Sequence, residues 1–117
     1  MGTFNYNNMV TVDMEDRLLA HLERVIVSKL RRQEKFQFSW LGEDGESRKA
    51  VWIEASIPVT FSYEHVVDDF NPAWLKTLVM AATTEAGLRP LPEPEMPAAK
   101  DTRTAKSAKS GGLRRVS

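Results

Sequence analysis

The side chains with the widest scope for chemistry are the two histidines and a group of acidic residues beside the second one. His65 follows Glu64 and precedes Asp68 and Asp69, and imidazole with carboxylates is a donor set that metal ions accept. A metal centre also requires three or four ligands that converge, and neighbouring positions in one loop do not supply that convergence. His21 lies near the edge of an apolar stripe, where we expect a boundary residue whose ring reaches water or a strand carbonyl. We therefore predict no metal site, no cofactor and no catalytic residue.

The other patterns that could support catalysis are missing or incomplete in the sequence. The chain has no cysteine, which excludes disulfides, thiol nucleophiles and thiolate metal sites. It contains no glycine-rich phosphate loop and no Gly-x-Ser-x-Gly nucleophile motif. Ser28 and Lys29 are adjacent on a predicted helix and so point apart, which excludes a serine–lysine pair. Glu43, Asp44 and Glu46 lack the spaced ligands of a calcium loop, and we predict a charged turn there.

Charge is distributed unevenly along a chain whose formal net charge is zero. Residues 1–98 contain 10 Lys/Arg and 15 Asp/Glu, whereas residues 99–117 contain six Lys/Arg and only Asp101. The second segment is rich in Ala, Lys, Ser and Thr and has no aromatic residue, which predicts a disordered basic tail. We expect this tail to contact DNA or RNA phosphates without sequence preference. The predicted nucleic-acid-binding residues are Lys100, Arg103, Lys106, Lys109, Arg114 and Arg115.

Three alternatives remain for this tail: an acidic protein partner, contact with the acidic remainder of the chain, or a solubilising role. A second basic group ends the first predicted helix, where we expect it to complement the helix dipole and to be solvated. Its members are Lys29, Arg31, Arg32 and Lys35.

Local signals predict the elements that must position these side chains. Alternating residues on either side of Asn7 and Asn8 predict a tight hairpin, because asparagine tolerates positive φ. Asp13 is the expected N-cap of a helix over residues 14–32, whose apolar residues recur at helical spacing. Period-two alternation then predicts three strands, over residues 36–40, 51–55 and 57–63.

A second helix is expected to follow the strands. Asn71 is its predicted N-cap, Pro72 occupies its first position, and Gly87 is the expected stop signal. Residues 88–91 could add a short edge strand. Four prolines between residues 90 and 97 then predict a stiff, extended connector.

Together these elements predict an α+β fold in the order β-β-α-β-β-β-α. We expect two layers, with an antiparallel sheet of about five strands and both helices on one of its faces. The predicted division of the chain is a globular domain over residues 1–91, a Pro-rich linker over 92–98 and the basic tail over 99–117. The hydrophobic fraction of 42% suffices for one packed core.

The polar face of the predicted sheet carries a candidate interface. Trp52 falls on that face, and an exposed aromatic residue on a flat sheet favours contact with a second subunit or a ligand. Partial cover by Arg48, Lys49 or a neighbouring loop is the alternative. The predicted interface residues are Trp52, Glu54, Thr60 and Ser62.

Several segments carry a resemblance to a known family. They are DRLLAHL at 16–22, VIVSKLRR at 25–32, FQFSW at 36–40, SIPV at 56–59, AW at 73–74 and GLRPLPEP at 87–94. Over roughly residues 1–94 the chain resembles a family of small actinobacterial and actinophage proteins of unknown function. That family usually has glycine where this chain has Asn7, which affects the type of the hairpin turn.

Members of that family often carry the label of ATP-dependent DNA ligase, which the resemblance would extend to this chain. A ligase of that class needs a lysine nucleophile in a Lys-x-Asp-Gly motif. The single Asp-Gly pair is Asp44-Gly45, and Gly42 stands where the lysine is required. The chain is also too short to enclose ATP and clamp a nicked duplex.

We therefore expect a non-enzymatic binding module. It would contact nucleic acid through its tail, or self-associate or hold a protein partner through its exposed sheet face. The alternative to nucleic-acid contact is a phage- or host-encoded interaction factor or assembly component that binds a protein partner through the exposed sheet face. No run of 18 apolar residues and no signal-peptide core is present, so we expect a cytoplasmic protein without membrane contact.

Overall fold

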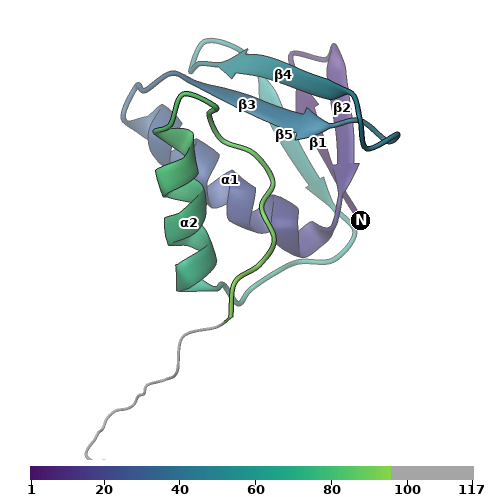
Figure 1. Cartoon of the computed structure of the whole chain (residues 1–117), viewed down its shortest axis with the longest axis vertical. Helices are drawn as coiled ribbons and strands as arrows, with labels where there is room; N and C mark the ends of the chain where they lie inside the picture. Colours follow the sequence, from purple (N-terminus) through teal and green to yellow (C-terminus); the bar gives the residue numbers. More distant parts are fainter. Residues whose placement is uncertain (96–117) are drawn as a thin grey trace, which may run out of the picture.

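Alternating apolar and polar residues form five short strands, and two apolar stripes at helical spacing form two helices (Figure 1). The computed structural model describes residues 1–95, and the predicted basic tail lies outside the described residues. The α+β class and the predicted element order are confirmed. The elements are β1 (Gly2–Tyr6), β2 (Val10–Met14), α1 (Asp16–Arg31), β3 (Phe36–Leu41), β4 (Arg48–Ile53), β5 (Val59–Tyr63) and α2 (Pro72–Ala82).

The strands form two sheets instead of the single sheet that we expected. One sheet has the order β2-β1-β5 and the other pairs β3 with β4, all antiparallel. After β4 the chain turns away through residues 54–58, and β5 then pairs with β1, so that Phe61 lies opposite Phe4. The sequence pattern predicts strands but not their neighbours, because alternation is the same for either partner.

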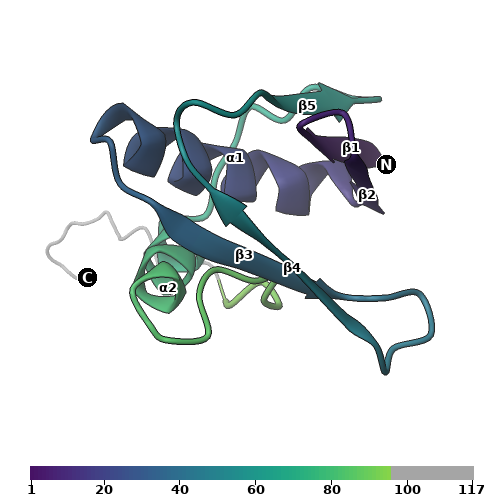
Figure 2. The same cartoon turned by 90° about the horizontal axis from the view of Figure 1, so that it is seen from above.

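The two helices pack against each other, and each of them packs against a different sheet (Figure 2). Helix α1 packs against β1 and β5, whereas α2 packs against α1 and β3. Phe4 of β1 and Phe38 of β3 are both fully buried and meet edge to face, with ring centroids 5.2 Å apart. Leu22 and Ile26 of α1 complete this centre and are also fully buried. The core therefore lies where both sheets and α1 converge.

The N-terminal hairpin forms as predicted, but α1 starts later than expected. Asn7 and Asn8 have φ values of 59° and 56°, and the Tyr6 carbonyl accepts the Met9 N–H at 3.1 Å. Asp13 is not the N-cap, because it pairs with Thr3 in the β1–β2 ladder and accepts its hydroxyl at 2.8 Å. Strand pairing through residue 14 displaces the helix start to Asp16.

Gly87 is not the C-cap of α2 but a point of close contact with β3. The helix ends at Ala82, and Gly87 has a φ of +80°. A Cβ atom there would stand 2.6 Å from the Gln37 carbonyl oxygen. Leu88 follows as a single parallel bridge to Phe38 in place of the predicted edge strand. The glycine thus allows the chain to run against β3.

Candidate binding surfaces

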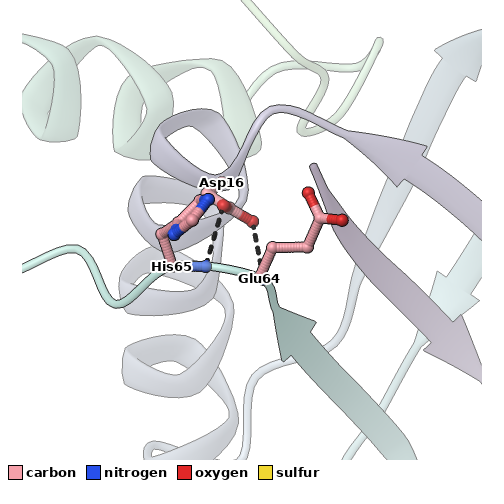
Figure 3. A group of neighbouring side chains, drawn as sticks. All are labelled: Asp16, Glu64 and His65. Atoms are coloured by element: carbon pink, nitrogen blue, oxygen red, sulfur yellow. Dashed lines mark hydrogen bonds between the residues drawn. The ribbon is translucent and has the colours of Figure 1, made fainter.

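The structure brings one group of potential metal ligands together, at the start of α1 and the end of β5 (Figure 3). One ligand atom from each of Asp16, Glu64 and His65 lies within 4.8 Å of the others. The Asp16 carboxylate already accepts the backbone N–H groups of Glu64, at 3.3 Å, and His65, at 3.1 Å. Asp16 therefore anchors the end of β5 to the first turn of α1, where the helix dipole also favours a carboxylate.

This group differs from the acidic cluster that the sequence predicts. Asp16 was missed because it is 48 residues from Glu64 in the chain. Asp69 is separated from the group and pairs with Arg17, with 3.3 Å between the guanidinium nitrogen and a carboxylate oxygen. Among residues 1–95, the amino group of Met1 lies 2.5 Å from Glu64 and 3.6 Å from Asp16. The contacts of Asp16 and Glu64 are those of an anchoring network.

His21 is a core residue and not the boundary residue that we expected. Its ring is fully buried and lies 4.4 Å from the Trp74 ring, centroid to centroid. Nε2 accepts the Asn71 N–H at 2.9 Å, so the neutral ring carries its proton on Nδ1, which donates to the Arg17 carbonyl at 2.7 Å. Burial disfavours the imidazolium form and lowers the pKa of His21 below its ordinary value.

Asn71 connects His21 to the segment that follows α2. Its Oδ1 caps α2 by accepting the N–H groups of Ala73, at 3.0 Å, and Trp74, at 3.4 Å, so the predicted N-cap is confirmed. Its Nδ2 donates to Glu93 at 3.0 Å and to the Pro94 carbonyl at 2.9 Å. One buried side chain thus holds the start of a helix and a distant part of the chain.

Glu93 receives a second set of contacts from α1. Arg17 binds both carboxylate oxygens of Glu93, at 3.0 and 2.9 Å. The Arg17 guanidinium and the Asn71 amide lower the pKa of Glu93 to about 2. Residues 93 and 94, which the sequence assigns to the linker, therefore contact the folded body.

The basic group at the end of α1 is divided by the fold. Lys29 is buried, and its Nζ donates to Glu34 at 2.9 Å. Arg32 pairs with the same carboxylate at 3.1 Å. Arg31 and Lys35 are exposed. Two of the four cations thus have a local structural partner.

The four predicted interface residues lie on both sheets. Trp52 is on β4 with 55% of its surface exposed, and Glu54 follows the same strand. Thr60 and Ser62 are exposed on β5, which belongs to the other sheet. The structure therefore separates the aromatic part of the predicted interface from its polar part.

The outer edge of β4 is open. Gln37 and Ser39 of β3 direct their backbone groups away from β4, where they bond Leu88 at 2.8 and 2.9 Å. Backbone groups alternate in direction along a strand, and in a non-hydrogen-bonded antiparallel pair the groups of both residues point away from the partner strand. Ala50 and Trp52 lie opposite Ser39 and Gln37, so their N–H and C=O groups point outward. Within residues 1–95, the Tyr6 hydroxyl reaches the Trp52 carbonyl, and no strand pairs with this edge.

These observations define a small α+β domain with two sheets, two helices and a C-terminal segment bound across its helices. The chain belongs to the family whose model is described as a domain of unknown function (DUF7882), which matches residues 1–93. Searches of curated proteins and of solved structures returned no match to this chain. In the described part of the chain, neither helix is long and apolar enough to cross a membrane. The six predicted nucleic-acid-binding residues lie outside the described residues.

Proposed function

We propose that this protein is a non-enzymatic binding module that associates with a second copy of itself through β4. The open outer edge of β4 is the observation that carries the proposal. An edge strand presents unpaired N–H and C=O groups to any extended chain, and natural proteins usually cover or charge such an edge. Trp52 is the last outward-facing position of β4, and its exposed ring offers apolar area beside the outward backbone groups of Ala50, while its own carbonyl accepts the Tyr6 hydroxyl.

The sequence of β4 favours one antiparallel register between two copies. With Ala50 on the two-fold axis, Arg48 of each copy lies opposite Trp52 of the other, which places a guanidinium against an aromatic face. Lys49 then lies opposite Val51. A register centred on Arg48 would set like charges directly opposite each other, which destabilises a strand pair. Arg48 and Lys49 are therefore compatible with the register centred on Ala50, and the repulsion between the two copies of Arg48 opposes the register centred on Arg48.

The test is Ala50→Pro, measured by sedimentation equilibrium over a wide range of protein concentration. Proline removes the outward N–H of Ala50 but leaves the hydrogen bonds between β3 and β4 intact, because Ala50 does not bond β3. We expect the dimer dissociation constant to rise at least about tenfold, which corresponds to about 1.4 kcal/mol. Ala50→Ser keeps the N–H and is the matched control, so it should associate like the natural chain.

A natural chain that stays monomeric at every concentration contradicts the proposal. Equal association of the Ala50→Pro and Ala50→Ser variants also contradicts it, because the edge would then not be the contact. Trp52→Ala is a second probe of the same surface, and it should weaken association without changing the core, since Trp52 is outside the buried set.

A second candidate function is sequence-independent contact with nucleic acid through residues 99–117. The basic composition of that segment favours it, with six Lys/Arg against one Asp. Neutralising about five phosphates predicts a slope of about −4 to −5 in the logarithm of the binding constant against the logarithm of salt concentration. Deleting residues 99–117 should abolish this binding to DNA or RNA. Unchanged binding after the deletion contradicts this candidate function.

A further inference from the structure

A groove runs between α1 and the segment that joins β5 to α2. Its volume is about 790 Å³, and residues of α1 from Ala20 to Arg31, with the C-cap residue Arg32, form one wall. Val66, Val67 and Phe70 of the connecting segment form the other wall. Val66 is 90% exposed, although its side chain is wholly apolar. The groove therefore offers apolar surface that no other part of residues 1–95 covers.

The rim of this groove on α1 is cationic. Arg24 and Arg31 are seven residues apart, which places them about 10 Å apart along the helix axis and on similar sides. The Arg24 guanidinium lies 3.7 Å from the centre of the Phe70 ring, which fixes its position. Neither arginine forms an ion pair with any residue in the described range 1–95.

The carboxylate that lines the groove has a local partner. Glu23 accepts the hydroxyl of Tyr63 at 2.5 Å, and burial together with this bond raises the pKa of Tyr63 well above its ordinary value. Arg32 also lines the groove, where its pairing with Glu34 offsets its charge. Glu23 keeps its negative charge, but the lining holds three arginines against this one carboxylate, so the groove is net positive. Within residues 1–95, Arg24 and Arg31 are the two of these arginines that form no ion pair.

We propose that this groove binds an acidic amphipathic segment of a partner protein. The apolar side chains of that segment would cover Val27, Val66 and Val67, and its carboxylates would pair with Arg24 and Arg31. Three turns of α1 line the groove, which matches a helical segment of similar length. Charge complementarity at the rim selects an anionic partner, and the apolar walls select one with its own apolar stripe.

The same geometry disfavours a nucleic acid as the occupant. Bases bind by stacking on flat aromatic faces. The Phe70 ring is covered by Arg24 and lies against the His21 ring, with 5.0 Å between ring centroids. Tyr63 is the other aromatic residue of the lining, and it is partly buried with its hydroxyl bonded to the Glu23 carboxylate, whose charge opposes a phosphate. The remaining apolar residues of the walls are aliphatic. The proposal rests on α1 and residues 63–70, so it is independent of the β4 edge.

The experiment is an NMR titration of the full chain, labelled with ¹⁵N, with three probes. The first is a synthetic amphipathic helical peptide with leucines at helical spacing and flanking glutamates. The second has the same leucines with flanking lysines, and the third is an oligothymidylate. We expect the acidic peptide alone to shift the amides of residues 20–32 and 63–70. Residue-by-residue shifts separate this groove from the basic segment 99–117.

Charge reversal then tests the rim. The double variant Arg24→Glu/Arg31→Glu should raise the dissociation constant of the acidic peptide by at least about tenfold. Lys76→Glu/Arg89→Glu reverses two exposed charges elsewhere and is the matched control. Val66→Asp changes an almost fully exposed side chain, so it should weaken binding without unfolding the protein.

Four results would overturn the proposal. They are equal shifts from the acidic and basic peptides, shifts confined to residues 99–117, groove shifts caused by the oligothymidylate, and equal affinities of the rim and control variants. A folded amide spectrum of each variant ensures that a loss of binding reports on the groove.

Discussion

Replacing Asn71 with alanine lowers the free energy of unfolding by about 2–4 kcal/mol. Loss of the cap removes the acceptor for the Ala73 and Trp74 N–H groups. Loss of Nδ2 removes two further bonds, to Glu93 and to the Pro94 carbonyl. The position is fully buried, so water does not replace these partners without disturbing the packing.

Serine at position 71 separates the two roles of the side chain. Ser is a good N-cap but cannot reach Glu93 and Pro94 as a donor, so Asn71→Ser should recover about 1 kcal/mol of the loss. Urea unfolding followed by circular dichroism measures both variants. Equal stability of the Ser and Ala variants would show that the cap has no measurable role, and a near-natural Ala variant would contradict the whole account.

Acidification from pH 6.5 to pH 5 should destabilise the protein by up to about 1.4 kcal/mol per pH unit through His21 alone. The folded protein keeps the ring neutral because burial lowers the pKa of His21, whereas the unfolded chain takes up the proton near the ordinary value of 6.5. This contribution is therefore complete above pH 6.5 and is lost as the pH falls. Arg17 beside the ring opposes its protonation, and Asp69 and Glu93 partly favour it.

The interval between pH 5 and 6.5 distinguishes the contribution of His21 to stability from that of the Glu93 carboxylate. The pKa of Glu93 is about 2 against an ordinary value of 4.5, so its contribution to stability is lost only as the pH falls below 4.5. Chemical unfolding at closely spaced pH values measures the slope. His21→Gln should flatten it between pH 5 and 6.5, whereas His65→Gln, at an exposed position, should leave it unchanged. A natural chain without a slope in this interval contradicts the prediction.

Elements with strong local signals were predictable from the sequence. The positive φ of Asn7 and Asn8 and the start of α2 at Asn71-Pro72 depend on the preferences of single residues, and both are confirmed. The exposure of Trp52 follows from strand alternation and is also confirmed. The start of α1 was wrong because pairing between β1 and β2 outcompetes a local cap at Asp13.

Contacts between distant segments were not predictable from one sequence. Asp16 meets His65 across 49 residues, His21 meets Asn71 across 50, and Arg17 meets Glu93 across 76. No periodicity encodes such pairs, because they depend on which strands become neighbours. The groove beside α1 also escaped the sequence reading, since Val66 and Val67 lie in an irregular segment that carries no pattern.

The bridge between Leu88 and Phe38 determines how far the β3–β4 ribbon can grow. Gly87 and Leu88 cover the edge of β3 that faces away from β4. Within the described chain, this two-stranded ribbon can therefore gain a further strand only at the outer edge of β4. If a second copy pairs there by two-fold symmetry, the β4 strand of each copy covers the open β4 edge of the other. Assembly by this route ends at a closed pair of copies, and the combined ribbon stops at four strands instead of extending into a fibril.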